Sequence, residues 1–390
     1  MASIELGSRV PPRRSPCPSS ADLSAEERED PAENQEIAME AWGANGAGQL
    51  GDGTNNDSSI PTLVPLNDPV IAVSAGGAHS LAVLDNHTVL AWGLNGRGQL
   101  GDNTTSDSNA PGFVSNLSDV DAIAAGGEHS LALLRDGTVM AWGANSSGQL
   151  GDNTFQDRLT PVAVERLSSV IAVAAGSSHS LALLTDGTVR AWGLNSQGQL
   201  GDGSGSGSPV PVTVSGLSGA IGIAAGGLHS LAVTTEATVQ AWGWNKFGQL
   251  GDGTNNDSPI PVSVSGLGGS VTAVAAGCQG DHSVALLDNG NVQTWGANTD
   301  GQLGDGTNDD SSTPVFADIS GVIRIAAGAG HTLALIADGH VLLTWGLNQA
   351  GQLGDGTNTS SSRPVTVITV LGVLAGMSRM SGGDSHSLSM

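Results

Sequence analysis

Residues 129–176 read HSLALLRDGTVMAWGANSSGQLGDNTFQDRLTPVAVERLSSVIAVAAG and form one complete copy of a unit that fills most of this 390-residue chain. Its central pentapeptide, GQLGD, lies six residues after a Trp-Gly pair. The pentapeptide occurs at 48–52, 98–102, 148–152, 198–202, 248–252, 301–305 and 351–355. Self-similarity at a period of about 50 residues indicates a repeat architecture. A motif present seven times is expected to build the fold, so function is sought where the copies differ.

Each unit contains four short apolar segments. HSLALL and TVMAWG are typical of strands, and Asp136-Gly137 between them predicts a hairpin with a type I′ turn. The same turn is expected at Asp186-Gly187, Asn289-Gly290 and Asp338-Gly339. PVAVERL (161–167), opened by a Pro that suits a strand start, and SSVIAVAAG (168–176) supply two more strands. Four antiparallel strands make one propeller blade, so the sequence predicts an all-β, seven-bladed β-propeller over 37–390.

The chain ends predict how the ring closes. The first unit begins with the Trp strand, at 37–42, and lacks the His strand that should precede it. The last unit ends with a His strand, at 386–390, and lacks the Trp strand that should follow. We therefore expect these two ends to pair and complete one blade, which removes open sheet edges. Truncating either end should destabilise the ring.

Residues 1–36 differ from the rest, being rich in Pro, Ser and charge with almost no periodic apolar pattern. This composition predicts a disordered acidic, Pro-rich tail, or alternatively a docking segment. We expect neither a signal peptide nor a membrane-spanning segment, and the two cysteines show no disulfide or metal-ligand spacing. We expect a cytoplasmic monomer without cofactors or metal. The net charge of −24 argues against nucleic-acid binding, which needs clustered Lys and Arg.

The Trp-Gly strand, the N-x-x-GQLG loop and the GGxHSLAL strand resemble the regulator of chromosome condensation repeat. The founding member of that family is a chromatin-bound exchange factor for a small GTPase, acting through an inserted β-wedge. In this chain the longest excess is three residues, around 277–282 and near 371–386, and a basic tail is missing. Plant ultraviolet-sensing members carry Trp before the repeat His. The matching positions here hold no Trp: Ala78, Glu128, Ser178, Leu228, Asp281, Gly330 and Ser385.

The repeated His and Asp residues are expected to be structural. The His residues open equivalent strands on different blades, too far apart to share a metal ion, and each should hydrogen-bond a neighbouring loop. The Asp of each GQLGD should form an Asx turn. Calcium binding in the DGTNND loops is the alternative, although their spacing differs from that of an EF-hand. No nucleophile elbow, phosphate loop or catalytic constellation is found, so the chain is not expected to be an enzyme.

The loops that follow the Trp strands differ in side chains that commonly anchor interfaces. One loop carries Trp244, Lys246 and Phe247, including the only Lys of the chain. Two blades earlier, Phe155 and Arg158 replace small or polar residues, and Arg97 stands at a position that varies before GQLGD. Residues 201–209 between them, GDGSGSGSP, have little bulk and would form a smooth saddle. The alternative for Trp244 is local packing on its own blade.

Three functions follow as hypotheses. The first is a non-enzymatic protein–protein interaction module that binds a protein partner through the loop face, using Trp244, Lys246, Phe247, Phe155, Arg158 and Arg97. The second is a guanine-nucleotide exchange regulator of a small GTPase. The third is a calcium-dependent structural or adhesion protein.

Overall fold

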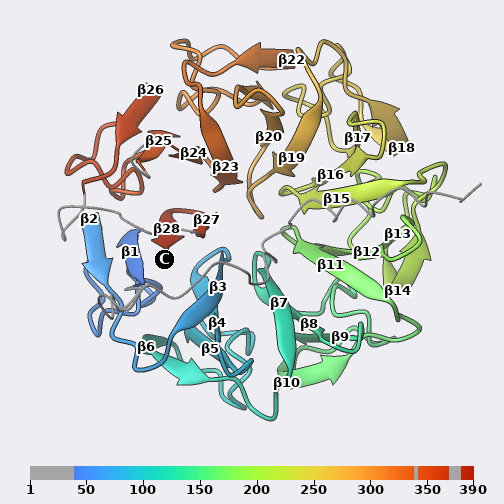
Figure 1. Ribbon diagram of the computed structural model, residues 1–390. Helices are drawn as coiled ribbons and strands as arrows, with labels where there is room; N and C mark the ends of the chain where they lie inside the picture. Colours follow the sequence, from blue (N-terminus) through green and yellow to red (C-terminus); the bar gives the residue numbers. More distant parts are fainter. Residues whose placement is uncertain (1–38, 338–340, 369–378) are drawn as a thin grey trace, which may run out of the picture.

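A computed structural model describes residues 39–337, 341–368 and 379–390 as seven four-stranded antiparallel sheets arranged in a ring (Figure 1). Each sheet is one blade, and its strands run in order from the centre of the ring to the rim. This confirms the seven-bladed propeller. The predicted tail at 1–36, the turn at Asp338-Gly339 and most of the excess near 371–386 lie outside the described residues.

Four sets of strands recur around the ring. The innermost strands are β3 (Val70–Ala75), β7 (Val120–Ala125), β11 (Val170–Ala175), β15 (Ala220–Ala225), β19 (Val271–Ala275), β23 (Val322–Ala327) and β27 (Met380–Gly382). The His strands are β4 (His79–Leu84), β8 (His129–Leu134), β12 (His179–Leu184), β16 (His229–Thr234), β20 (His282–Leu287), β24 (His331–Ile336) and β28 (His386–Ser389).

The third and fourth sets lie further out. The Trp strands are β1 (Glu40–Gly43), β5 (Val89–Gly93), β9 (Val139–Gly143), β13 (Val189–Gly193), β17 (Val239–Gly243), β21 (Val292–Gly296) and β25 (Leu342–Gly346). The rim strands are β2 (Ser58–Leu63), β6 (Ser108–Phe113), β10 (Arg158–Ala163), β14 (Ser208–Thr213), β18 (Ser258–Ser263), β22 (Ser311–Phe316) and β26 (Ser361–Thr366).

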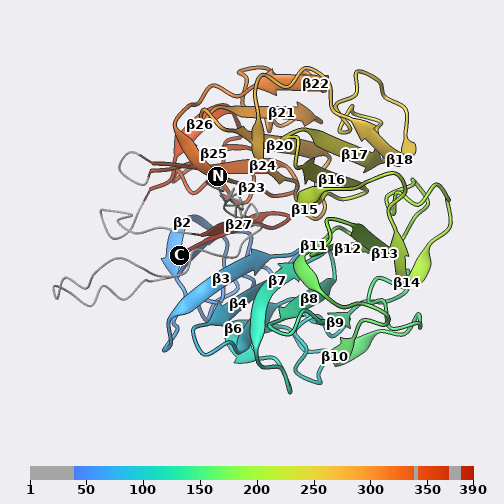
Figure 2. The same cartoon turned by 45° about the vertical axis from the view of Figure 1, so that its right-hand side comes forward.

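Ring closure occurs as predicted. β1 pairs with β28, placing Glu40 opposite Ser389 and Gly43 opposite His386. The closing blade therefore has the order β2-β1-β28-β27, with strands from both ends of the chain. In Figure 2 the red and blue ends of the chain meet in this blade.

Two local predictions were wrong. In the β8–β9 hairpin the carbonyl of Leu134 accepts from Gly137 N at 2.9 Å, and Gly137 alone takes a positive φ (+80°). This is the three-residue loop of a type I turn followed by a left-handed residue, not a type I′ turn. Strand β10 begins at Arg158, three residues before Pro161, because a rim strand tolerates a Pro whose missing N–H faces away from the sheet.

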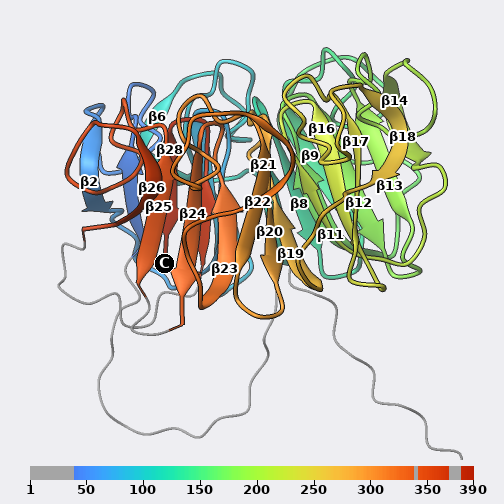
Figure 3. The same ribbon diagram turned by 90° about the horizontal axis from the view of Figure 1, so that it is seen from above.

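The two faces of the ring carry different connections (Figure 3). We call loop face the side with the turns that enter the His strands and the loops that follow the Trp strands. The hairpin face carries the turns that join His strands to Trp strands, such as residues 135–137. The C-terminal end of β28 points to the hairpin face.

Each GQLGD clasps the next blade. The carbonyl of Gln49 accepts hydrogen bonds from Trp92 Nε1 at 2.9 Å and from Ser80 Oγ at 2.8 Å. Gly51 lies against the same indole, so closely that a Cβ there would be 2.6 Å from Trp92 Nε1. All seven Trp residues of the Trp strands are fully buried in this way.

The clasp predicts that Gly51→Ala strongly destabilises the protein. An Ala side chain would face both a positive φ (+71°) and the Trp92 ring. We expect the free energy of unfolding to fall by about 3 kcal/mol or more, measured by urea denaturation.

The control is Gly53→Asn, at a position with φ +82° and open space around it. The equivalent residues Asn103 and Asn153 already take positive φ, so Asn is compatible with this backbone. Equal destabilisation by both substitutions would contradict the role of the Trp contact.

Candidate functional site

The loop between β17 and β18 carries the aromatic residues singled out from the sequence. The Trp244 and Phe247 rings meet edge to face, with centroids 5.4 Å apart and an interplanar angle of 82°. Both side chains are half-buried, whereas Lys246 is exposed and holds its Nζ 5.6 Å from the centroid of Phe247. The structure therefore brings Trp244, Lys246 and Phe247 together. We call these three residues the aromatic cluster.

A buried Asn holds this loop in place. Asn245 accepts from Leu250 N at 2.9 Å through Oδ1 and donates through Nδ2 to Asp252 and Thr254. Its own N–H donates to Asp257 Oδ1 at 2.8 Å. The six other loops contain the same fully buried Asn. The aromatic cluster thus projects from a rigid support, which lowers the entropy cost of using it in binding.

The Asp of GQLGD forms the predicted Asx turn. Asp252 Oδ1 accepts from Thr254 N at 2.8 Å and from Thr254 Oγ1 at 2.9 Å. Equivalent bonds recur in the other loops, for example at Asp52 and Asp355. One oxygen of each of these carboxylates, the Oδ1, is therefore already an acceptor for donors in its own loop. Among the described residues no group of three or more His, Cys, Asp or Glu side chains is placed to hold a metal ion.

The other three predicted residues lie two or three blades away. Phe155 is 58% exposed on the β9–β10 loop. Arg158 turns back onto its own loop, where Nη2 lies 2.7 Å from Asp152 Oδ2. Arg97 reaches from the neighbouring blade to Asp157 at 3.2 Å and Glu128 at 4.0 Å. Both Arg side chains are therefore paired internally, which leaves Phe155 as the unengaged group of this second cluster.

The blade between the two clusters has the smooth loop expected from the sequence. Gly207 takes the place of the Asp that, in the aromatic-cluster loop, accepts from the buried Asn. A Cβ at Gly207 would lie 2.8 Å from the carbonyl of Gly193, whereas one at Gly205 would meet nothing within 4 Å. The intervening blade therefore separates the two clusters without raising a side-chain wall between them.

The turn at 277–281, within the segment 277–282 that carries three extra residues, reaches over the loop-face end of the central channel, which the sequence did not reveal. Gly280 accepts from Gly227 N at 2.8 Å on one neighbouring blade. On the other side, a Cβ at Gly277 would lie 2.0 Å from the carbonyl of Gly328. Gln279 reaches across the ring, with its Nε2 against Gly77. The turn therefore packs into the ring and does not project from it as a wedge.

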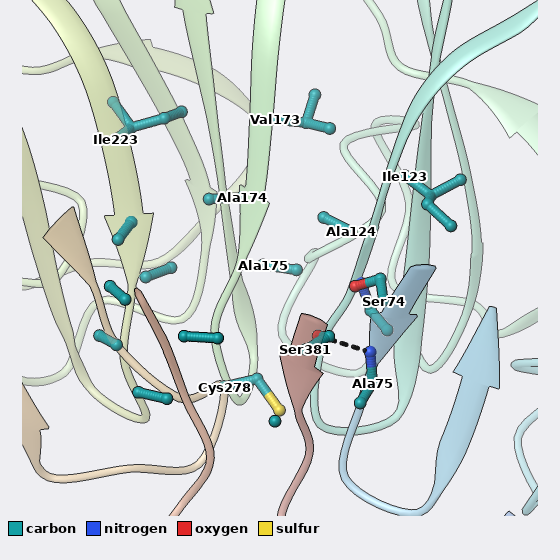
Figure 4. A pocket seen from close by; sticks show the side chains of 18 of the residues that line it. Ser74, Ala75, Ile123, Ala124, Val173, Ala174, Ala175, Ile223, Cys278 and Ser381 are labelled. Carbon is teal, nitrogen blue, oxygen red and sulfur yellow. Dashed lines mark hydrogen bonds between the residues drawn. The ribbon is translucent and has the colours of Figure 1, made fainter. Parts of the chain in front are cut away.

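Beneath this turn, the inner strands line a cavity of about 190 Å³ (Figure 4). Its wall is mostly Ala and Ile, with the hydroxyls of Ser74 and Ser381 and the thiol of Cys278. Ser381 Oγ accepts from Ala75 N at 3.0 Å, so it joins neighbouring blades. Burial raises the pKa of the Cys278 thiol to about 12, and a protonated thiol is a poor nucleophile.

The seven repeat His residues form a closed ring of bonds between blades. His79 Nε2 lies 3.0 Å from Ser130 Oγ of the next blade, and His386 Nε2 closes the circle 3.0 Å from Ser80 Oγ. The partner is thus a strand hydroxyl and not the neighbouring loop that the sequence suggested. Because Ser80 Oγ donates to the Gln49 carbonyl, the His must donate from Nε2. Each Nδ1 is then an unprotonated atom, buried without a partner.

Comparison with known proteins places the chain in a family. The model of the RCC1-like domain matches residues 38–389. The chain belongs to the RCC1-like domain family. Its fold matches that of human WBSCR16, with a TM-score of 0.80 and 25% identity over 90% of this chain and 98% of that one. It also matches Prp20p of Saccharomyces cerevisiae, with a TM-score of 0.81 and 24% identity over 92% of each chain.

Curated relatives match over single stretches. The ultraviolet-B receptor UVR8 of Arabidopsis thaliana is 45% identical over 65 residues, which cover 16% of this chain and 15% of that protein. The human E3 ubiquitin-protein ligase HERC2 is 46% identical over 56 residues, or 14% of this chain and 1% of HERC2. The matches therefore span a small part of these relatives. In the described part of the RCC1-like chain, no helix is long and apolar enough to cross a membrane.

The His ring predicts that stability falls as the pH is lowered below 6.5. Burial lowers the pKa of His79 to about 4 and that of His129 to about 3, against about 6.5 in an unfolded chain. Between pH 6.5 and about pH 4, the His residues of the unfolded chain take up protons, whereas those of the folded ring stay neutral. Each such His therefore costs roughly 1.4 kcal/mol of stability per pH unit.

The measurement is the urea midpoint from pH 7.5 to pH 5. Burial also raises the pKa of Asp281 to about 6, and this group works in the opposite direction as the pH falls. Burial raises the pKa of Glu40, Asp300 and Asp384 in the same direction. These four carboxyls are outnumbered by seven His, so a net loss is expected. A midpoint that stays constant over this range would contradict the neutral, Nε2-protonated ring.

Proposed function

We propose that this chain is a non-enzymatic interaction module that binds a protein partner through its loop face, with Trp244 and Phe247 as anchors. One observation carries the proposal: of seven loops held by the same buried Asn, a single one presents a packed pair of aromatic rings. Aromatic side chains on a rigid support are typical anchors of protein interfaces.

The family supports a role in protein binding. Prp20p was characterised together with its binding to Gsp1p and to histones, and a yeast RCC1 (Prp20) structure contains Kap60. These are partners of Prp20p, and for this chain they support only the class of function. The proposed site consists of Trp244, Lys246 and Phe247, with Phe155 as a second contact. Arg97 and Arg158 would contribute through the loop geometry that their internal ion pairs hold.

Replacing both Trp244 and Phe247 by Ala should leave thermal stability nearly unchanged and weaken partner binding by about 2 kcal/mol or more. The rings are half-buried and touch each other, so their loss should leave the blade core intact. The partner is first captured from native cells by chemical cross-linking to the full chain. The affinity of the purified partner for the wild type and for the variant is then measured.

The matched control is Phe113→Ala, which removes an exposed ring (62%) from the rim strand β6. The control should bind the partner like the wild type. A large loss of stability with unchanged capture would show that the two rings serve local packing, and would overturn the proposal.

Regulation of a small GTPase is the second candidate, favoured by the likeness to Prp20p, whose binding to Gsp1p has been described. Of the two segments with extra residues, the one that the structure describes, at 277–281, folds over the channel and provides no projecting wedge. We therefore expect the purified chain not to accelerate nucleotide release from a panel of small GTPases carrying a fluorescent nucleotide. A clear acceleration that is lost in the Trp244→Ala, Phe247→Ala variant would instead establish exchange activity at this face.

A further inference from the structure

The loop face is strongly acidic. Its turns and loops carry seventeen carboxylates: Asp52, Asp57, Asp102, Asp107, Glu128, Asp152, Asp157, Asp202, Asp252, Asp257, Asp281, Asp300, Asp305, Asp309, Asp310, Asp355 and Asp384. Three cations lie among them, and a fourth, Arg363, reaches the edge of this face beside Gly306. Arg97 pairs with Asp157, Arg158 with Asp152 and Arg363 with Asp318, and Lys246 lies over Phe247.

Two carboxylates of the next blade hold positions equivalent to residues in or next to the aromatic cluster. Trp244 N donates to the carbonyl of Leu228 at 3.0 Å, and in the next blade Ala297 N makes the same bond to Asp281. Asp281 therefore holds the place that Leu228 holds beside Trp244. Asp300 likewise holds the place of Phe247 in its own loop. The bond from Gly227 N to Gly280 O joins the two turns directly. Three blades earlier, Arg97 at the place of Phe247 lies 4.0 Å from Glu128 at the place of Asp281, so a cationic side chain can span these two positions.

Asp281 and Asp300 lack a compensating charge. Both are half-buried, and neither takes part in an ion pair with any residue that the structure describes. Burial raises the pKa of Asp281 to about 6, and it also raises that of Asp300. A nearby cation stabilises the charged form of a partly desolvated carboxylate. An aromatic face also attracts cations. The Nζ of Lys246 already lies 5.6 Å from the centroid of the Phe247 ring, within the range of this interaction.

We propose that the loop face binds a basic polypeptide segment, in which a Lys or Arg side chain lies against Trp244 and Phe247 and faces Asp281 and Asp300. This rests on the proposed function and specifies the chemistry of its partner. In the free protein the ammonium group of Lys246 lies over the face of the Phe247 ring, and the cationic side chain of the partner displaces it. An acidic partner would instead face seventeen carboxylates on this surface.

Trp244 provides a reporter for the test. It is half-buried, whereas the other seven Trp side chains of the chain are fully buried. Acrylamide quenching of Trp fluorescence in the full chain therefore reports on Trp244. We expect a synthetic Lys-Gly repeat peptide to shift the emission and to protect it from acrylamide, with an effect that weakens as salt is added. A matched Glu-Gly peptide should do neither.

Three variants separate local recognition from general charge attraction. Asp281→Asn combined with Asp300→Asn should weaken binding of the Lys peptide about fivefold, in line with exposed ion pairs. Lys246→Gln should tighten it about two- to fivefold, because it removes a competing cation. Asp136→Asn combined with Asp186→Asn removes the same charge from the hairpin face, where Asn can keep the Asx turns, and should leave binding unchanged.

The proposal is overturned if the Lys peptide leaves Trp244 emission unchanged. It is also overturned if the hairpin-face control weakens binding as much as the loop-face variant, or if Lys246→Gln weakens it. A response to the Glu peptide alone would reject the basic partner while retaining binding at Trp244. If neither peptide changes the emission but partner capture still depends on Trp244 and Phe247, the basic-partner proposal is rejected and the proposed function stands.

Discussion

The structure depends on one backbone carbonyl that each blade offers to the next. In every GQLGD the Gln carbonyl accepts both the indole N–H of the next Trp strand and the hydroxyl of the next His strand. At Gln352 these donors are Trp42 at 2.9 Å and Ser387 at 3.1 Å, so the same pair of bonds joins the two ends of the chain. Because each carbonyl uses both of its lone pairs, it holds two strands of its neighbour at once.

This arrangement explains why the motif changes so little along the chain. The first Gly of the motif packs against the rim strand of the next blade: a Cβ at Gly48 would lie 2.5 Å from Asn109 Cα. The second Gly packs on the indole ring of the next Trp strand. The buried Leu anchors the loop through its N–H to Asn, and the Asp closes the turn. The hydroxyl that donates to the Gln carbonyl can then only accept further hydrogen bonds, and it accepts one from the His of the preceding blade. The protonation state of seven His residues thus follows from the same carbonyl.

Most of the fold could be predicted from the sequence because every blade repeats the same local pattern. Blade number and ring closure follow from the spacing of the Trp residues and from the incomplete first and last units. The turn type could not be read correctly, because the positive φ needed at Gly137 serves a type I turn with a following left-handed residue as well as type I′. His87 and Ala237 take the same conformation without Gly, so the signal lies in the hairpin geometry and not in the residue type.

The candidate site was only half visible in the sequence. Trp244 and Phe247 stood out because they interrupt a repeat, and the structure shows that they touch each other. Asp281 and Asp300 carried no such signal, since they belong to the next blade, whose turn is hydrogen-bonded to the turn of the aromatic-cluster blade. A repeat that clasps its neighbour by backbone atoms leaves the side chains between the clasps free to vary without loss of stability. Binding chemistry can therefore arise on any blade, and the proposed site combines the side chains of one loop with those of the next blade.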